Sequence, residues 1–438
     1  GDDVIKGYQP INTDSVTLGS GNDRIHLKVT GDGTTYKPNY GSLNVGTLDG
    51  GSGSDWLMFD VASGGDLTLT TGGASNFENL GGTSGNDTLK GDSNDNIIAG
   101  GGSLDINGIF EMRAGGTDTV YGYGGNDTIV AGGTIYGGAG NDSITGDFSN
   151  DTLDGGTGKD TITSGSGSDT IVLRAGDGNA SLSSADIITD FSDGSDVLGL
   201  ATGSGSLTFG DLTISQGTGS NANHVIISKT STSEILQIVQ NTTTSNITGA
   251  DFMSMSTSAI NFTGTSGTDV FVGGAGNDTF TTDAGADEMY GHVGDETFTV
   301  DGSGNKTIDG GAGTDTLNIT TISNITSFTS ITKDPTTGFF TFTDASSNVI
   351  SVKNIETFSI SGNSYGSLAD NNPSGFSNVA QLFYNDSVTI GGAKVGVFYN
   401  EGTTGGSNSQ NLYYAEQLWP DGHDVRLIGS SGSENLNL

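Results

Sequence analysis

Aspartates recur at a fixed spacing in the middle of this sequence. Asp142, Asp151, Asp160 and Asp169 are each nine residues apart, and a glycine-containing stretch precedes each one. A carboxylate is a hard oxygen ligand that suits calcium, and glycine allows backbone carbonyls to come close to a bound ion. The spacing therefore indicates a row of similar calcium sites.

Each of these aspartates is the sixth residue of a nine-residue unit. An isoleucine or leucine follows two positions later, mostly between small polar residues, which predicts a three-residue strand with its middle side chain facing inward. Four units follow one another without a break: 137–145 (GGAGNDSIT), 146–154 (GDFSNDTLD), 155–163 (GGTGKDTIT) and 164–172 (SGSGSDTIV). Less regular units lie at 19–26, 50–58, 82–90, 122–130, 264–272, 273–281 and 310–318.

These units resemble the GGxGxDxUx nonapeptide of the RTX (repeats-in-toxin) calcium-binding family. The resemblance implies a parallel β-roll, in which two nonapeptides form one coil and calcium lies between loops stacked on the same edge. Same-edge loops are then eighteen residues apart, and the implied pairs are Asp142 with Asp160, Asp151 with Asp169, and Asp269 with Asp287. We predict an all-β chain of parallel β-roll (RTX solenoid) segments, interrupted and capped by small β-sandwich or β-sheet modules.

The repeats and the resemblance together predict a set of calcium ligands and about six to twelve bound ions. The predicted ligands are Asp23, Asp55, Asp87, Asp118, Asp127, Asp142, Asp151, Asp160, Asp169, Asp190, Asp193, Asp196, Asp269, Asp278, Asp287 and Asp315. Asp190, Asp193 and Asp196 belong to the stretch DFSDGSD, which resembles the segment that ends the roll in type I secreted relatives. The alternative is that the aspartates form Asx-turns without metal, but like charges stacked so closely would repel.

Some units depart from the pattern. Asn96 and Lys306 occupy sixth positions, so their loops are doubtful calcium sites, and Glu296 replaces the aspartate expected eighteen residues after Asp278. Because Lys306 lies in the unit before Asp315, we expect Asp315 to contribute less to calcium binding than a ligand in a regular run. The stretches 76–80 (NFENL) and 354–358 (NIETF) look like one local device used twice beside a roll.

The pattern divides the chain into eight segments. We predict degenerate repeats at 1–60, a β connector at 61–81, the main roll at 82–175, a β cap module at 176–261, a second roll at 262–320, a β module at 321–364, an aromatic-rich β domain at 365–428 and the start of a further repeat at 429–438. The sequence begins and ends inside repeat-like text, so we expect it to be a fragment of a longer protein.

The composition limits the kinds of partner that the protein can bind. The 438 residues carry a net charge of −37, which excludes nucleic acid, and no run of eighteen apolar residues is present, so no membrane insertion is expected. Cysteine is absent, so the sequence contains no disulfide framework, thiolate metal site or cysteine nucleophile. The resemblance implies type I secretion and an extracellular location.

Catalysis has little support in the sequence. No HExxH motif occurs, and His26, His224, His292 and His423 lie far apart. The stretch 362–366 (GNSYG) matches GxSxG at Ser364, but no strand-to-helix elbow is predicted around it.

Three functions remain open. The first is an extracellular or cell-surface structural protein, S-layer-like or adhesin-like, that binds copies of itself or surface polysaccharide. The second is a non-catalytic secretion and folding domain of an exported enzyme or toxin, and the third is a hydrolase that uses Ser364. We favour the first, because several β modules separate the rolls and an aromatic-rich region follows them. That region is predicted to be either the core of a small domain or a binding face.

Overall fold

The computed structural model describes residues 1–8, 15–27, 47–59, 64–69, 74–101, 116–323, 328–334, 336–366, 389–390 and 393–394. The chain divides into two compact units, unit 1 (Gly1–Phe252) and unit 2 (Met253–Leu438). The described residues form strands and short 3₁₀ turns, without any α-helix. No helix among them is long and apolar enough to cross a membrane. Most of the aromatic-rich stretch 365–428, and all of 429–438, lie outside the described residues.

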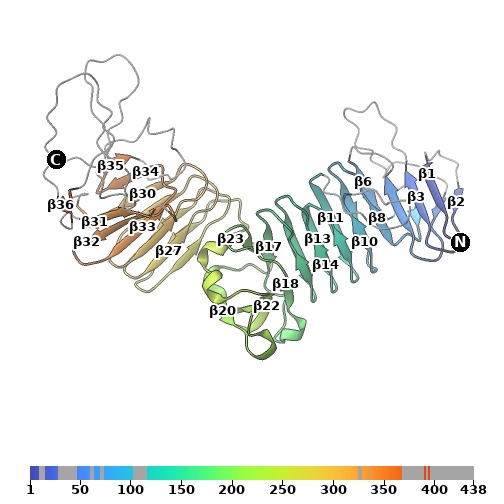
Figure 1. Ribbon diagram of the computed structural model, residues 1–438, viewed down its shortest axis with the longest axis horizontal. Helices are drawn as coiled ribbons and strands as arrows, with labels where there is room; N and C mark the ends of the chain where they lie inside the picture. The colour runs from blue at the N-terminus through green and yellow to red at the C-terminus, as the bar shows by residue number, and fades with distance from the viewer. Residues whose placement is uncertain are drawn as a thin grey trace, which may run out of the picture. The chain divides into compact units, whose positions relative to one another are not determined.

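Unit 1 is a parallel β-roll (Figure 1). Its first sheet contains, in spatial order, β1 (Val4–Tyr8), β3 (Arg24–Leu27), β5 (Trp56–Phe59), β8 (Asn79–Gly81), β10 (Ile97–Ala99), β12 (Thr128–Val130), β14 (Ser143–Thr145), β16 (Thr161–Thr163), β18 (Asp186–Ile188), β22 (Glu234–Val239), β21 (Val225–Lys229) and β20 (Leu212–Gln216). Its second sheet contains β23 (Phe252–Ser254), β19 (Val197–Leu200), β17 (Thr170–Leu173), β15 (Thr152–Thr157), β13 (Gly133–Ala139), β11 (Asp118–Gly124), β9 (Thr88–Lys90) and β6 (Asp66–Thr68). A smaller parallel sheet joins β2 (Ser15–Thr17), β4 (Thr47–Asp49) and β7 (Ala74–Ser75).

The two large sheets of unit 1 enclose a narrow core. The chain alternates between the two sheets, so each coil adds one short strand to each sheet. The middle residue of a short strand points inward. Ile144 and Ile162 are paired in one sheet and Leu153 and Ile171 in the other, all at most 1% exposed. The predicted three-residue strands and the eighteen-residue coil are confirmed here.

A small antiparallel module closes the C-terminal end of this roll. Strand β22 pairs parallel to β18, and β21 and β20 then continue the sheet antiparallel. The 3₁₀ turns η3 (Leu182–Ser184), η4 (Phe209–Asp211), η5 (Gly219–Asn221), η6 (Thr244–Asn246) and η7 (Gly249–Asp251) lie in the connections around this module. An open roll end would leave backbone groups and apolar side chains in water, and these elements cover it.

Unit 2 repeats the same plan. One sheet contains β24 (Asn261–Thr263), β26 (Thr279–Thr281), β28 (Thr297–Val300), β30 (Thr316–Ile319), β34 (Thr357–Ile360) and β35 (Asn363–Gly366). The other contains β25 (Val270–Val272), β27 (Asp287–Tyr290), β29 (Lys306–Asp309), β33 (Val349–Lys353), β32 (Phe340–Asp344) and β31 (Phe328–Lys333), and β36 (Thr389–Ile390) pairs with β37 (Ala393–Lys394) separately. Strands β31, β32 and β35 are antiparallel additions to otherwise parallel sheets.

Aromatic side chains fill the core of unit 2. The rings of Phe262, Phe280 and Phe298 form a continuous stack, with centroids 4.9 and 4.7 Å apart. Phe280 and Phe298 are fully buried, as are Met289 and Ile308 of the facing sheet. Because phenylalanine buries more apolar area than isoleucine, this core compensates for the small number of coils in unit 2.

The coils stack so closely that side chains are excluded from one face of the turns. Gly158 has φ +140°, and a Cβ built on it would lie 1.6 Å from the carbonyl oxygen of Gly140 in the preceding coil on the same edge. Only glycine fits there, both because of the positive φ and because of this approach.

Gly158→Ala should therefore destabilise the roll more than a matched substitution in open space. Gly176 also has a positive φ, +102°, but nothing lies within 4 Å of the Cβ position. Both alanine variants lose roughly 1–2 kcal/mol to backbone strain, while Gly158→Ala loses a further 1–3 kcal/mol or so to overpacking. Thermal unfolding in millimolar calcium measures the difference, and equal shifts for the two variants would contradict the close stacking.

Candidate calcium sites

Each repeat aspartate joins its own coil to the neighbouring coil on the same edge. The backbone N–H of Asp127 donates to Oδ1 of Asp142, that of Asp142 to Oδ1 of Asp160, and that of Asp160 to Oδ1 of Asp186, at 2.7, 2.7 and 2.9 Å. We call such a series of stacked sixth positions the carboxylate ladder. The predicted pair Asp142 and Asp160 is thereby confirmed as a same-edge pair.

Four ladders run through the described residues. In unit 1, one edge carries Asp23, Asp55, Glu78, Asn96, Asp127, Asp142, Asp160 and Asp186. The other carries Asp87, Asp118, Asp151, Asp169 and Asp196, with Gly133 at the position between Asp118 and Asp151. In unit 2, one edge carries Asp278, Glu296, Asp315 and Glu356, and the other carries Asp269, Asp287 and Lys306. The spacing of fifteen between Asp127 and Asp142 is a shortened coil within the first ladder.

The second carboxylate oxygen is the unusual feature of the ladder. In many of these residues Oδ2 is buried and accepts no hydrogen bond, as in Asp23, Asp55, Asp118, Asp127, Asp142, Asp160, Asp169 and Asp315. Burying an unpaired carboxylate oxygen is costly, and a cation beside it removes that cost. These unpaired oxygens are therefore the ligands that a metal ion would be expected to bind.

Glycines leave room for backbone oxygens beside these carboxylates. A Cβ on Gly137 would lie 2.5 Å from Oδ2 of Asp142, and a Cβ on Gly155 would lie 2.5 Å from Oδ2 of Asp160. No group of three or more His, Cys, Asp or Glu side chains within the described residues could hold a metal alone. Calcium would thus be held by carboxylates of two stacked coils together with backbone carbonyls, a ligand set that calcium accepts.

Burial raises the pKa of several ladder carboxyls. The pKa rises to about 7 for Asp118, Asp127 and Asp160, to about 6 for Asp169 and to about 8 for Asp186. Removal from water is the largest cause in each case, and neighbouring carboxylates raise the pKa further. Without a bound cation, the folded protein is therefore most stable when some of these carboxyls are protonated.

The family model described as the RTX calcium-binding nonapeptide repeat (4 copies) matches residues 73–106, 114–133, 136–171, 145–179, 263–295 and 300–318. The chain carries RTX calcium-binding repeats. No curated protein matches the sequence. The ladder extends beyond the matched residues to Asp23 and Asp55, which are fully buried and make the same contacts as the repeats that match.

The structure sorts the predicted RTX ligands by what their Oδ2 contacts. Five further predicted ligands belong to the ladder, but their Oδ2 accepts from a backbone N–H group of their own loop. They are Asp87, Asp151, Asp196, Asp269 and Asp278. Asp190 lies outside the ladder and accepts from the N–H groups of Ser164 and Gly165 at 2.8 and 3.0 Å. Asp193 is exposed and also lies outside it.

Sequence reasoning missed three carboxylates that complete the ladders. Asp186 accepts from the N–H of Asp160, Glu78 from that of Asp55 at 2.8 Å, and Glu356 from that of Asp315 at 2.7 Å. Nine-residue counting could not find them, because long excursions of the chain separate each from the preceding ladder residue.

The repeated stretches NFENL and NIETF did contain a signal for the two glutamates. Asn76 and Asn354, two residues before them, both have a positive φ, 55° and 52°. Their side-chain amides donate to Asp49 and Asp309 at 2.7 and 2.8 Å. The expectation that the two stretches are one local device is confirmed, and the device returns the chain to the ladder with glutamate in place of aspartate.

The lower contribution of Asp315 to calcium binding stays a prediction, but the structure does not support Lys306 as its cause. Nine residues separate them, so they lie on opposite edges: β29, which begins at Lys306, pairs with β27, whereas Asp315 is stacked between Glu296 and Glu356. Because the chain alternates between two edges, a substituted sixth position affects the ladder residue eighteen positions away, not the one nine positions away.

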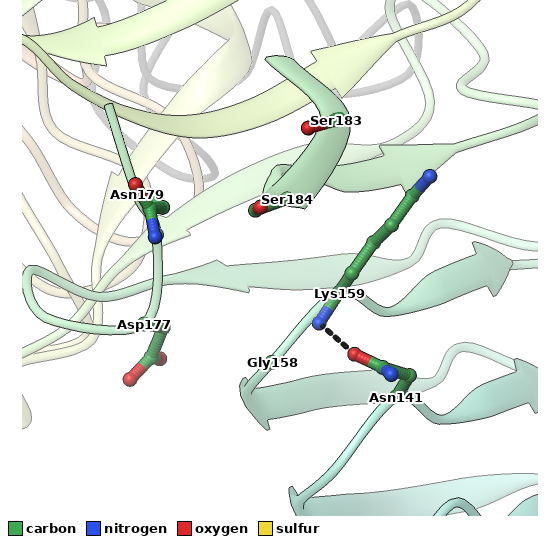
Figure 2. A pocket seen from close by; sticks show the side chains of 8 residues that line it. Asn141, Gly158, Lys159, Asp177, Asn179, Ser183 and Ser184 are labelled. Atoms are coloured by element: carbon green, nitrogen blue, oxygen red, sulfur yellow. Dashed lines mark hydrogen bonds between the residues drawn. The ribbon is translucent and has the colours of Figure 1, made fainter. Parts of the chain in front are cut away.

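A polar hollow of about 420 Å³ lies beside the cap of unit 1 (Figure 2). It is lined by Asn141, Gly158, Lys159, Asp177, Gly178, Asn179, Ser183 and Ser184. Burial raises the pKa of Asp177 to about 7, although Arg174 lowers it. The lining contains amides, hydroxyls and one ion of each sign, but no aromatic side chain, and small-molecule pockets are usually lined by apolar groups.

Asp160→Asn should weaken calcium binding and stabilise the metal-free protein. The amide keeps an oxygen acceptor for the N–H of Asp142 but removes a buried charge. Each lost site removes about 2.7 kcal/mol at calcium concentrations of about 100 times Kd. Calorimetric titration and melting with and without calcium check both signs. The exposed Asp193→Asn is the control, and equal calcium loss in the two variants would contradict the ladder.

Metal-free protein should lose stability as the pH rises from about 4 to about 7. Asp118, Asp127 and Asp160 have raised pKa values, so the folded state binds more protons than the unfolded state over this range, and stability falls by up to about 1.4 kcal/mol per pH unit for each group. Calcium requires ionised ligands, so its binding should strengthen over the same range. Melting of metal-stripped protein at several pH values tests this, and stability that rises with pH would contradict it.

Proposed function

We propose that the chain is an extracellular structural protein of a cell surface, S-layer-like or adhesin-like, in which calcium drives folding of the RTX rolls and their assembly. The observation that carries the proposal is the carboxylate ladder, which runs through both units and leaves buried oxygens without a partner. Each unit has its own roll and its own antiparallel closure. A row of such closed modules suits a structural chain.

The location follows from the calcium chemistry. Extracellular calcium modules bind with Kd values of roughly 10⁻⁴–10⁻³ M, and the chain carries a net charge of −37. Where calcium is scarce the ladders stay repulsive and the folded state is only weakly stable, which suits export before folding through type I secretion. The fold then becomes stable where calcium is abundant.

A non-catalytic role fits the surroundings of Ser364. This residue lies inside β35, which pairs antiparallel with β34, whereas a nucleophile elbow places its serine in the sharp turn after a strand. The backbone here makes an edge hairpin instead. The polar hollow of unit 1 offers no histidine among its lining residues. We therefore propose no hydrolase activity.

Calcium also changes how copies of the chain meet. Roughly ten calcium ions would offset about 20 negative charges, and physiological salt screens the remainder within about 8 Å. Long-range repulsion between copies then falls, and the surfaces can contact one another or surface polysaccharide.

Adding millimolar calcium to metal-stripped protein should therefore convert monomers into sheets or filaments, and chelator should release the protein from cells. Light scattering and negative-stain microscopy follow the first effect, and cell washes follow the second. Magnesium is the control, since its strict octahedral geometry suits the site poorly. A protein that binds calcium yet stays monomeric and binds no cells would favour a secretion and folding domain instead.

A further inference from the structure

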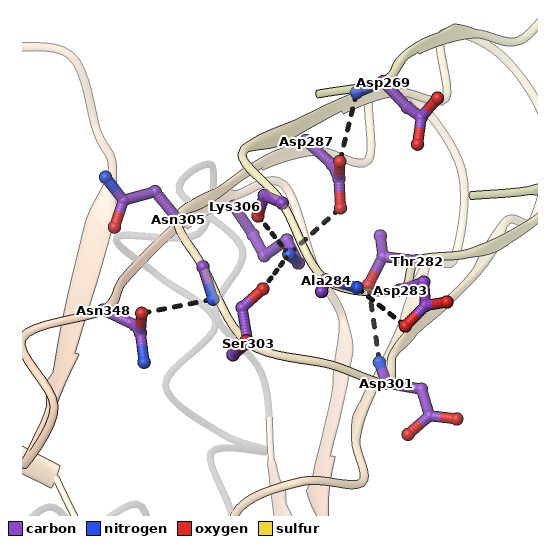
Figure 3. A network of polar contacts seen from close by, with 12 residues as sticks. Asp269, Thr282, Asp283, Ala284, Asp287, Asp301, Ser303, Asn305, Lys306 and Asn348 are labelled. Carbon is purple, nitrogen blue, oxygen red and sulfur yellow. Dashed lines mark hydrogen bonds and ion pairs between the residues drawn. The ribbon is translucent and has the colours of Figure 1, made fainter. Parts of the chain in front are cut away.

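Lys306 is a buried cation inside the calcium-binding part of unit 2 (Figure 3). Its side chain is fully buried, and Nζ lies 3.0 Å from Oδ2 of Asp287. The same ammonium donates to the carbonyl oxygens of Gly285 and Ser303 at 2.7 and 3.0 Å. Gly285 belongs to the loop of Asp287, and Ser303 to the loop that ends in Lys306. The ammonium therefore lies between two stacked loops.

The loops around this ammonium have the same backbone pairing as the regular repeats. In the regular run, the N–H of Gly140 donates to the carbonyl of Thr157 in the next coil at 2.8 Å. In unit 2, the N–H of Gly285 donates to the carbonyl of Ser303 at 2.9 Å. Gly140 and Gly285 both lie two residues before the ladder aspartate, so the two carbonyls that bind the ammonium have direct counterparts beside Asp142.

The close glycine contact is also the same. A Cβ on Gly158 would lie 1.6 Å from the carbonyl oxygen of Gly140, and a Cβ on Gly304 would lie 2.0 Å from that of Gly285. What differs is the ladder oxygen. Oδ2 of Asp142 and Oδ2 of Asp287 are both buried without a hydrogen bond, but only Oδ2 of Asp287 has a cation beside it, the Lys306 ammonium at 3.0 Å.

The rest of the loop is adapted to a missing carboxylate. The N–H of Asp287 has no Oδ1 to bind in the next coil and donates to the carbonyl of Asn305 at 3.0 Å instead. On the far side, the loop contacts the cap: the N–H of Gly304 donates to Asn348 at 3.2 Å, and the N–H of Val349 donates to Asn305 at 2.9 Å. This loop is therefore the last of its edge.

We propose that the Lys306 ammonium takes the position of a calcium ion between the loops of Asp287 and Lys306, so that this contact of unit 2 is held without metal. The inference rests on the calcium-binding function proposed above. One ammonium balances one carboxylate, whereas two stacked aspartates need a divalent cation. The lysine thus gives the roll, beside its cap, a coil contact that forms before calcium arrives.

Three variants of the full chain test this inference. Lys306→Asp restores the sixth-position carboxylate, Lys306→Met removes the charge at similar length, and Lys229→Asp makes the same charge change in strand β21 of the unit 1 closure. Bound calcium is counted by equilibrium dialysis in millimolar calcium, and melting is followed in calcium and in chelator.

Lys306→Asp should bind about one more calcium ion per chain than the unchanged protein. It should melt lower in chelator, because two carboxylates then face each other, and recover in millimolar calcium. Lys306→Met should melt about 6 °C or more lower in both conditions, because Asp287 is left buried without a cation. Lys229→Asp should leave the ion count unchanged. It lies opposite Glu234 and beside Asp211, so any fall in its melting temperature should be alike in calcium and in chelator.

Hydrogen exchange gives a local measurement on the same proteins. In chelator, amides of residues 283–309 should exchange at least about tenfold more slowly in the unchanged protein than in Lys306→Met. In saturating calcium, Lys306→Asp should restore this protection. Peptides covering 137–163 should behave alike in all variants.

The outcomes separate this inference from the proposed function. If the unchanged protein binds no calcium, the proposed function fails. If it binds calcium but Lys306→Asp adds no ion, or stays unfolded in millimolar calcium, the inference alone fails. It also fails if Lys306→Met matches the unchanged protein in melting and exchange.

Discussion

The stacking of buried carboxylates is the constraint on which the whole structure depends. Each ladder aspartate accepts an N–H from the neighbouring coil through one oxygen and leaves the other buried, as at Asp142 and Asp160. The contact that joins coils therefore also brings negative charge into the interior. Hydrogen bonding alone favours the roll, while electrostatics oppose it until protons or cations arrive. Folding and calcium binding are for this reason strongly coupled.

The narrow core makes this dependence stronger. A coil of unit 1 contributes about two inward apolar side chains, such as Ile144 and Leu153, so the hydrophobic effect supplies little stability per coil. Unit 2 uses Phe280 and Phe298 for the same positions and has a lysine in one ladder. We interpret unit 2 as the part of the chain whose fold depends less on calcium.

The regular repeats made much of the fold predictable from the sequence, and their interruptions set the limit. A nine-residue period fixes which edge each aspartate occupies and which side chain faces inward, as at Asp160 and Ile162. It says nothing once the chain makes an excursion: 23 residues separate Asp55 from Glu78, and 41 separate Asp315 from Glu356. Only the three-dimensional strand register shows that the chain returns to the same ladder.

The ends of the ladders follow from the same electrostatics. An aspartate in the middle of a ladder has a loop on both sides with which it could share bound cations, whereas one at the end has a loop on one side only and would keep an unbalanced charge. In two of the ladders, the register partner beside the cap is no longer acidic: Asp186 lies opposite Gln237, and Asp287 lies opposite Lys306. A neutral amide avoids additional repulsion, and an ammonium removes the need for a cation. In these two ladders, the cap thus limits the repulsion at the end of the ladder and also pairs the backbone groups of the last coil.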